Sequence, residues 1–497
     1  MSESNSKDLK QAAIVGGAWG GVSRLVRVVC QLASIIFLSR LLTPEDFGVV
    51  ATVVSLVTVV NLLRELGLAH AIVQQPKIDN DELNCLFKFT CLLGGGLFAT
   101  SILIGYGASW FFGDSRLVYL APFYGLASML SSVEVIALGL LRRKLKFQTI
   151  AIREIVAGII GTGGSILIAW MGGGYWAIVA APVLMQLTNT ILSWKAVSWR
   201  PKRSSSPMRS ISHYLKFGAT VTFGEFANLV SANVDRIMVG KIWGFSQLGF
   251  YSRSHLMVSV PTEIVASPVN STLLPILTKM NDNPERKRKW IIQFYRAMLI
   301  LAGTLAAALY ATANDVIVLL MGSGWVKSAP LVMGLTPFLF LKPAGGVIYS
   351  VLIGVGDKKA LLSWTWIGAL ISVTAIVASA PKGLEALVIA ISIALVVRML
   401  VSIYFVNHLL GSLAAPLLAG LAIGSLNFLG CIFVFSELRA LTQEHDFHLV
   451  ASVFVVGVAT GGVMFFWGVS DSFVRKIFWI GYVKFRDKVS GEDNRKP

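Results

Sequence analysis

Apolar runs of about twenty residues follow one another along almost the whole chain, and each is long enough to cross a bilayer as a helix. Of the 497 residues, 14% are charged, whereas a soluble protein carries about 25%. The short alternating strands of a membrane barrel do not occur. We therefore predict an all-α polytopic membrane protein with about fourteen transmembrane helices, at roughly residues 12–38, 47–69, 86–112, 117–141, 150–170, 174–197, 214–239, 248–276, 289–312, 328–353, 360–380, 384–406, 413–435 and 448–469.

Lysine and arginine are unevenly divided between the connecting segments. One alternate set contains the run Arg142–Lys146, the group from Lys195 to Arg209 and the tail from Arg475, whereas the other set has few basic residues. Cytoplasmic loops carry the excess of Lys and Arg, so both termini are expected in the cytoplasm. The net charge of +17 is then mostly a topology signal rather than a nucleic-acid patch. The polar N-terminus leads directly into the first run, so no cleavable signal peptide is expected.

Two segments 201 positions apart resemble each other. SRLLTPEDFGVV at Ser39–Val50 aligns with GKIWGFSQLGFY at Gly240–Tyr251, which pairs Gly48 with Gly249. Repeated halves with a binding site between them are typical of secondary transporters. We predict an N-terminal six-helix lobe at 1–200, a C-terminal six-helix lobe at 201–410, two additional helices at 411–470 and a charged cytoplasmic tail at 471–497.

Ionisable side chains inside the predicted helices are the most informative residues. An arginine at the middle of a bilayer costs about 2.5–3.5 kcal/mol even on the mildest scale. Arg24 and Arg27 lie near the middle of the first helix, so they either line a wet cavity or form a buried ion pair with Glu65 or Glu263. Lys342 lies mid-helix beside Pro343, where a helix can kink and open a polar cavity.

Three carboxylates, Glu225, Asp235 and Glu263, are candidates for carrying a coupling proton or sodium ion. Glu225 and Asp235 share one face of the seventh helix. The same residues could equally balance the arginines. Other ionisable side chains near helix ends are expected to extend to the membrane interface: Arg153, Glu154, Arg236, Arg296 and Arg398.

Several sites are not expected. The chain has no GxxxxGK[ST] phosphate loop, no GxSxG or HExxH motif and no paired-Cys motif, so we predict neither its own ATPase nor a cofactor. His445 and His448 offer too few ligands for a metal. Short outer loops argue against an enzyme that polymerises or ligates glycans. The glycine pairs Gly16/Gly20 and Gly17/Gly21 predict close helix contacts.

The hairpin SRLLTPEDFG, its echo GKIWGFSQLGFYSR, DRIMVG at Asp235–Gly240 and the loop LRRKLKF at Leu141–Phe147 together resemble one family. The chain looks like a polysaccharide exporter of the multidrug/oligosaccharidyl-lipid/polysaccharide superfamily, in the group of Wzx-type flippases similar to the colanic acid exporter. The resemblance implies two six-helix lobes around a central cavity in the bacterial inner membrane. By analogy with lipid II flippases, it also implies cavity arginines at Arg24, Arg64 and Arg253.

The resemblance implies translocation of an undecaprenyl-diphosphate-linked oligosaccharide for cell-surface polysaccharide or lipopolysaccharide synthesis, with a glycan polymerase and a chain-length regulator as partners. Fixed guanidinium groups in a wet cavity could replace the hydration of the diphosphate. The alternatives are a cation-coupled multidrug exporter of the same superfamily and a membrane glycan polymerase or ligase. A basic cavity favours an anionic cargo.

Overall fold

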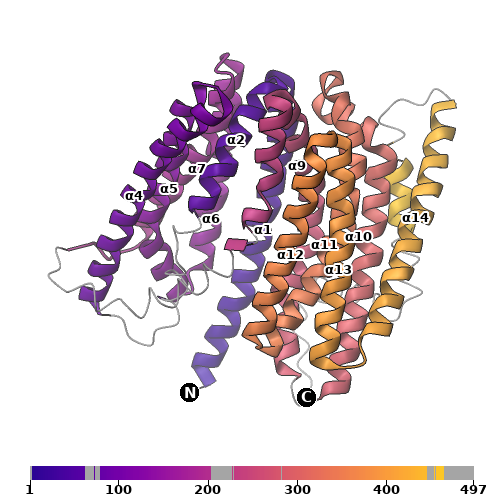
Figure 1. The fold of residues 1–497 in the computed structure, drawn as a ribbon. Coiled ribbons are helices and arrows are strands. Elements are labelled where there is room, and N and C mark those ends of the chain that lie inside the picture. The colour runs from indigo at the N-terminus through magenta and orange to yellow at the C-terminus, as the bar shows by residue number, and fades with distance from the viewer. Residues whose placement is uncertain are drawn as a thin grey trace. The chain divides into compact units, whose positions relative to one another are not determined.

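The computed structural model describes residues 3–61, 72, 79–202, 226–227, 229–280, 283–444, 453 and 455–463. Within these ranges the protein is helical and contains no strand (Figure 1). The elements are α1 (Glu3–Leu41), α2 (Pro44–Asn61), α4 (Asn80–Phe112), α5 (Arg116–Arg143), α6 (Phe147–Trp170), α7 (Tyr175–Ala196), α9 (Val234–Lys279), α10 (Pro284–Met321), the 3-10 helix η2 (Ser323–Ser328), α11 (Ala329–Val355), α12 (Lys358–Ser379), η3 (Ala380–Lys382), α13 (Leu384–Leu410) and α14 (Ala414–Glu444).

Ten helical segments in the described residues are long and apolar enough to cross a membrane. The predicted all-α polytopic class is therefore confirmed. Most predicted spans begin within a few residues of the first residue of a helix. Some helices continue beyond the predicted end, α10 to Met321 and α14 to Glu444. The predicted count of fourteen stays a prediction, because half of span 214–239 and more than half of span 448–469 fall outside the described residues.

The chain divides into two compact units. Unit 1 consists of residues 1–253 with 320–325 and 372–384, and unit 2 consists of residues 254–319, 326–371 and 385–497. Unit 1 therefore takes in short segments from the second half of the sequence. The domain boundaries predicted from the sequence, at residues 200, 410 and 470, stay predictions.

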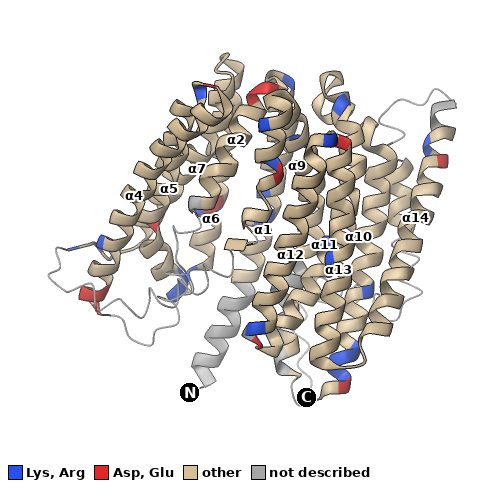
Figure 2. Ribbon diagram, in the orientation of Figure 1, with Lys and Arg blue, Asp and Glu red and all other residues tan. Residues whose placement is uncertain are grey.

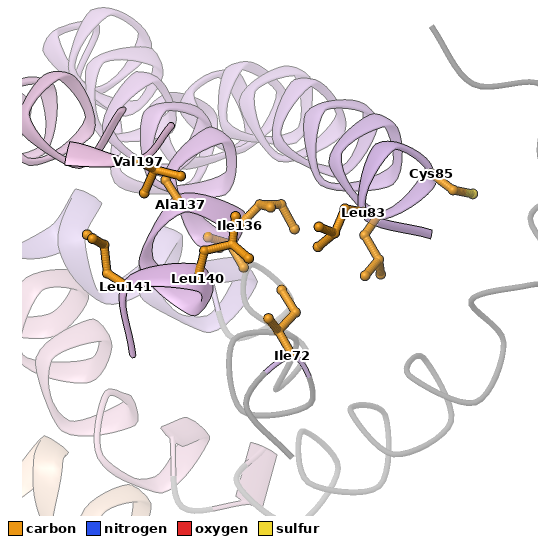
Figure 3. Packing of buried hydrophobic residues seen from close by; sticks show 10 residues of the cluster. Ile72, Leu83, Cys85, Ile136, Ala137, Leu140, Leu141 and Val197 are labelled. Carbon is orange, nitrogen blue, oxygen red and sulfur yellow. The ribbon is translucent and has the colours of Figure 1, made fainter. Parts of the chain in front are cut away.

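Helix packing in unit 1 follows from the apolar sequence of its helices. α4 packs on α5, α6 on α7, α1 on α6 and α5 on α7. One buried cluster joins Ile72 and Val197 to residues of α4 and α5, among them Leu83, Ile136 and Leu141 (Figure 3). A second cluster joins α2 to parts of α4, α5 and α7. Charged residues gather mainly near the helix ends, and a few lie along the helices (Figure 2).

The turn between α1 and α2 is formed by local hydrogen bonds. The Thr43 backbone N–H and hydroxyl donate to Asp46 Oδ2 over 2.9 and 2.7 Å, and the Asp46 N–H donates to Thr43 Oγ1 over 3.3 Å. This reciprocal pair caps the first turn of α2. Pro44 begins the helix, a position where its missing N–H costs nothing. The sequence TPED therefore specifies where α1 ends and α2 begins.

The equivalent break in the second half lies at Gly244, inside α9. Gly244 has φ 81° and ψ 172°, so it separates two helical segments. Only glycine adopts this backbone conformation without steric cost. Because Gly244 stands 201 positions after Thr43, the two helix breaks coincide in the repeat alignment.

The repeat also appears as a reciprocal contact. A Cβ atom on Gly48 would collide with the carbonyl of Phe245, and a Cβ on Gly249 would collide with the carbonyl of Pro44. Phe245 and Gly249 are the repeat equivalents of Pro44 and Gly48. Each glycine thus admits the backbone of the other repeat, as expected for a local two-fold relation. We call Pro44, Gly48, Phe245 and Gly249 the glycine interlock.

Candidate functional site

Helix α1 presents two arginines on an exposed surface within the membrane-spanning segment Gly16–Leu41. Both Arg24 and Arg27 are exposed, and 60% of the Arg27 side chain is accessible. Arg27 Nη2 lies 3.3 Å from Glu154 Oε2 on α6. Glu154 therefore contacts only part of the guanidinium, and most of the Arg27 side chain stays accessible.

The partner of Arg27 differs from the two carboxylates that the sequence suggested. Glu154 is one-third exposed and pairs with the arginine, whereas it was expected to extend to the membrane interface. Packing of α1 on α6 causes this pairing, since it brings the two side chains together. Glu65, the first suggested partner, lies outside the described residues, as do the candidates Arg64 and Glu225.

Arg253 is placed differently from the arginines of α1. It lies on α9 with 6% exposure, and its Cζ is 3.5 Å from the centroid of the Phe47 ring. Its Nε has no hydrogen-bond partner, and no carboxylate among the described residues forms an ion pair with it. The guanidinium is held by an aromatic face and not by an anion. A negative group could therefore still bind it favourably.

Asp235 forms a brace across the break in α9. Its side chain is 6% exposed and accepts a hydrogen bond of 2.5 Å from the Tyr251 hydroxyl. It also accepts one of 2.8 Å from the Arg236 backbone N–H. The contact with Tyr251 joins the helical segments on either side of Gly244. Its proposed part in ion coupling stays a prediction.

A second group of charges lies on unit 2. Lys342 is exposed on α11, and its Nζ stands 4.5 Å from the centroid of the Phe338 ring, one turn earlier. The His255 ring of α9 is 5.2 Å from the same ring. Glu263 and Arg398 lie close enough to Lys342 to interact with it electrostatically. The structure therefore brings together two candidates, Lys342 and Glu263.

Arg398 and Phe338 were not chosen as site residues from the sequence. The Arg398 guanidinium lies against Gly368 of α12, where a Cβ would stand 3.0 Å from Nε. Gly368 has no side chain and so leaves room for the guanidinium of Arg398. A glycine within an apolar helix is the signal that the sequence offered. Phe338 lies four residues before Lys342, so the i, i+4 spacing of an aromatic and a cation could have indicated the pair.

A buried polar network inside unit 1 corrects the expectation for Arg153. This residue is 6% exposed and forms an ion pair with Glu134 of α5. Glu134 also accepts hydrogen bonds from Gln186 at 2.5 Å and Ser193 at 2.9 Å, both on α7. Arg153 therefore stays inside the helix bundle, where its Nη1 contacts the Glu134 carboxylate and the Ser193 hydroxyl, although its Nε has no hydrogen-bond partner.

No group of three or more metal-ligating side chains occurs in the parts of the chain that the structure describes. His445 and His448 lie outside those parts. The described cations include the exposed Arg24, Arg27 and Lys342 and the buried Arg153 and Arg253.

Comparison with known proteins places these features in context. A family model described as polysaccharide biosynthesis protein matches residues 37–330. The succinoglycan biosynthesis transport protein ExoT of Rhizobium meliloti is 24% identical over 455 residues, covering 90% of each chain. The lipopolysaccharide biosynthesis protein WzxC of Escherichia coli is 22% identical, over 69% of this chain and 70% of its own.

Solved structures show the same fold at low identity. The lipid II flippase MurJ in an inward closed conformation superposes with a TM-score of 0.68 and 12% identity, covering 91% of this chain and 99% of its own. A multidrug resistance MATE transporter in an inward-facing conformation gives a TM-score of 0.60 and 16% identity, covering 79% of this chain and 98% of its own. Both likenesses concern the arrangement of helices.

Proposed function

Because this chain belongs to the polysaccharide biosynthesis protein family, we propose that it is a flippase for a polyprenyl-diphosphate-linked oligosaccharide. One observation carries the proposal: Arg24, Arg27 and Lys342 are exposed along membrane-spanning helices. Cations at this depth are costly against lipid and are favourable only beside water or an anion. A lipid-linked diphosphate is an anion that has to pass this depth.

The arginines supply what a diphosphate loses when it leaves water. A guanidinium donates two parallel hydrogen bonds to phosphate oxygens and stays charged at any physiological pH. Arg24 and Arg27 on unit 1, with Arg64 and the buried Arg253, are the proposed diphosphate ligands there. Lys342 is the proposed ligand on unit 2. The polyprenyl chain can remain in the bilayer while only the polar part is carried.

Transport by alternating access fits a repeated fold of this kind. We propose that the protein transports without catalysing a reaction or using a cofactor. The driving force would come from consumption of the flipped lipid or from a proton or sodium gradient. Glu225, Asp235 and Glu263 are the proposed coupling residues for the gradient.

The setting follows from the same proposal. The protein would act in the bacterial inner membrane, with both termini in the cytoplasm, and would supply cell-surface polysaccharide or lipopolysaccharide synthesis. Its product would pass to a glycan polymerase and a chain-length regulator. Export of cationic drugs is the alternative, supported by the fold shared with a multidrug transporter. Exposed cations would repel such a cargo.

A flipping assay tests the proposal. Full-length protein in proteoliposomes is given a fluorescent polyprenyl-diphosphate oligosaccharide, and protection from an external quencher is followed. We expect Arg24→Ala and Arg27→Ala to flip about tenfold more slowly or worse, since each loses a charge-assisted hydrogen-bond donor. Lys144→Ala removes an exposed cation after α5 and is the matched control.

One result would overturn the proposed function, and another would overturn only the assignment of the two arginines. Wild-type protein that leaves the glycolipid in place but moves a cationic dye along a proton or sodium gradient would establish the drug exporter instead. Normal flipping by both arginine variants would assign these residues a structural role. The proposed cargo would then still stand.

A further inference from the structure

The glycine interlock adjoins a chain of aromatic contacts within unit 1. The Phe47 ring packs edge-on against Trp325, with ring centroids 5.4 Å apart. Trp325 also packs on Phe250 at 5.6 Å and donates its indole N–H to the Ser39 carbonyl over 2.7 Å. These residues come from α1, α2, η2 and α9, so the contacts join both halves of the sequence.

Phe47 connects this aromatic group to Arg253. Its ring contacts Trp325 on one side, and its face carries the guanidinium of Arg253 at 3.5 Å. Phe47 is 4% exposed and Trp325 is 3% exposed. The next residue in the chain after Phe47 is Gly48 of the glycine interlock. The contact of Phe47 with Arg253 and the glycine interlock therefore join the same two helices, α2 and α9.

The contact with Phe47 is weaker than an anion would provide. An aromatic ring attracts a cation through its quadrupole, whereas a phosphate offers full negative charge and hydrogen-bond acceptors. No carboxylate in the described parts of the chain takes that place, and Arg253 Nε has no hydrogen-bond partner. An arriving phosphate would thus have a clear advantage over the ring.

We propose that Phe47 and the diphosphate of the cargo compete for the guanidinium of Arg253, so that cargo binding releases the glycine interlock. This inference rests on the proposed flippase function. Phe47 is a positioning residue: without cargo it holds Arg253 and keeps α2 against α9. Binding of the diphosphate and closure of the interlock then exclude each other, which couples the two events reciprocally.

The competition predicts that a substitution in the core tightens diphosphate binding instead of weakening it. Phe47→Leu keeps an apolar side chain of similar size but removes the aromatic face. Because the competitor is lost, farnesyl diphosphate should bind the full-length protein roughly three- to thirtyfold more tightly. Phe47→Trp strengthens the ring contact and should weaken binding. A purely structural Phe47 would give unchanged or weaker binding in the leucine variant.

Two controls make the binding result specific. Phe250→Leu removes the other aromatic neighbour of Trp325 without removing the ring that contacts Arg253. An equal gain in this variant would assign the effect to loosened packing and overturn the competition. Farnesol, which lacks the diphosphate, should bind wild type and Phe47→Leu alike.

Cross-linking tests release of the interlock with Phe47 intact. Thr52 Oγ1 lies 3.3 Å from the position of a Cβ on Gly240, so Thr52→Cys with Gly240→Cys should form a disulfide while α2 and α9 are in contact. The natural Cys30, Cys85, Cys91 and Cys431 are replaced first. We expect farnesyl diphosphate, but not farnesol, to slow cross-linking at least about threefold.

The outcomes separate this inference from the proposed function. If wild type binds the diphosphate and flips the glycolipid while Phe47→Leu shows no gain and cross-linking is unchanged, the competition is wrong and the flippase stands. If neither wild type nor Phe47→Leu binds farnesyl diphosphate, both proposals fail. Tighter binding in Phe47→Leu together with diphosphate-dependent loss of cross-linking supports the competition.

Discussion

Glu134 and Arg153 show how single residues make a charge tolerable inside a helix bundle. The pair lies at about 5% and 6% exposure, and Gln186 and Ser193 supply further hydrogen bonds to the carboxylate. Such a pair need not add net stability, but loss of one partner leaves an uncompensated buried charge. The network therefore holds α5, α6 and α7 in one arrangement.

Neutralising Glu134 should destabilise unit 1 strongly. Glu134→Gln leaves Arg153 without its ion-pair partner, which should lower the free energy of unfolding by about 3–5 kcal/mol. The apparent Tm of the detergent-solubilised protein should fall by more than about 5 °C. Glu285→Gln, at the exposed start of α10, is the matched control. Glu134→Met with Arg153→Met should recover much of the loss, and failure to do so would mean that the charges themselves are needed.

Asp114, between α4 and α5, makes a pH-dependent contribution. Burial tends to raise the pKa of its carboxyl, but hydrogen bonds from Arg116 and the charge of Arg116 outweigh this and lower the pKa below the ordinary 3.8. Arg116 also pairs with Glu45 of α2 at 2.7 Å. The carboxyl therefore titrates at lower pH in the folded protein than in the unfolded chain.

A lowered folded-state pKa means that the stabilisation is complete above the unfolded pKa and is lost as pH falls through the folded one. Asp114→Asn should lower the apparent Tm by a constant amount between pH 7 and about pH 5. The difference from wild type should shrink below the ordinary value of 3.8. A difference at pH 3 as large as at pH 7 would contradict this origin.

At the scale of elements, the glycine interlock determines how closely α2 approaches α9. Gly48→Ala and Gly249→Ala each push a methyl group into a backbone carbonyl of the other repeat. Overpacking of this kind costs about 1–3 kcal/mol. Because the two contacts are equivalent, both variants should lower the apparent Tm and the flipping rate to a similar extent.

Gly96→Ala is the control for the interlock variants. Gly96 lies on the exposed face of α4, and a Cβ atom placed on it would have no neighbouring atom within 4 Å. Alanine there should be neutral or stabilising by about 0.5–1 kcal/mol. If Gly48→Ala lowers the apparent Tm strongly and Gly249→Ala does not, the two contacts contribute unequally to stability despite their two-fold relation.

The sequence predicted the helices and the repeat, because apolar length and the TPEDFG echo are local patterns. It did not predict which glycines are in tight contact. Gly17, Gly20 and Gly21 have no atom within 4 Å of a Cβ position, although Gly16 meets Phe147. Spacing shows that two small residues share a face, but not whether another helix packs there.

Partners of the charged residues were also beyond the sequence. Arg27 pairs with Glu154, and Arg153 pairs with Glu134 rather than extending to the interface. Each pairing depends on which helices are neighbours in the fold. For Arg27 the cost of a charge at membrane depth predicted either a wet cavity or a carboxylate partner, and for Arg153 the sequence predicted extension to the interface. The observed pairings required α1 on α6 and α5 against α6 and α7.

At the scale of the whole molecule, the proposed function requires a way for an ion gradient to act on an anionic cargo. Glu263 is exposed on α9 and interacts electrostatically with Lys342 of α11. A charged Glu263 partly neutralises the ammonium that would meet the diphosphate. Protonation or sodium binding at Glu263 would remove this competition, so ion binding and cargo binding would favour each other.

Glu263→Gln tests this coupling because it imitates the neutral carboxyl. We expect the variant to bind farnesyl diphosphate several-fold more tightly than wild type and to flip the glycolipid at a rate that no longer responds to an imposed proton or sodium gradient. Glu385→Gln, at the start of α13, is the matched control. Flipping that still accelerates with the gradient in Glu263→Gln would exclude Glu263 as the coupling residue. Retained coupling together with tighter binding would restrict its role to tuning Lys342, and the ion would then act at Asp235 or Glu225.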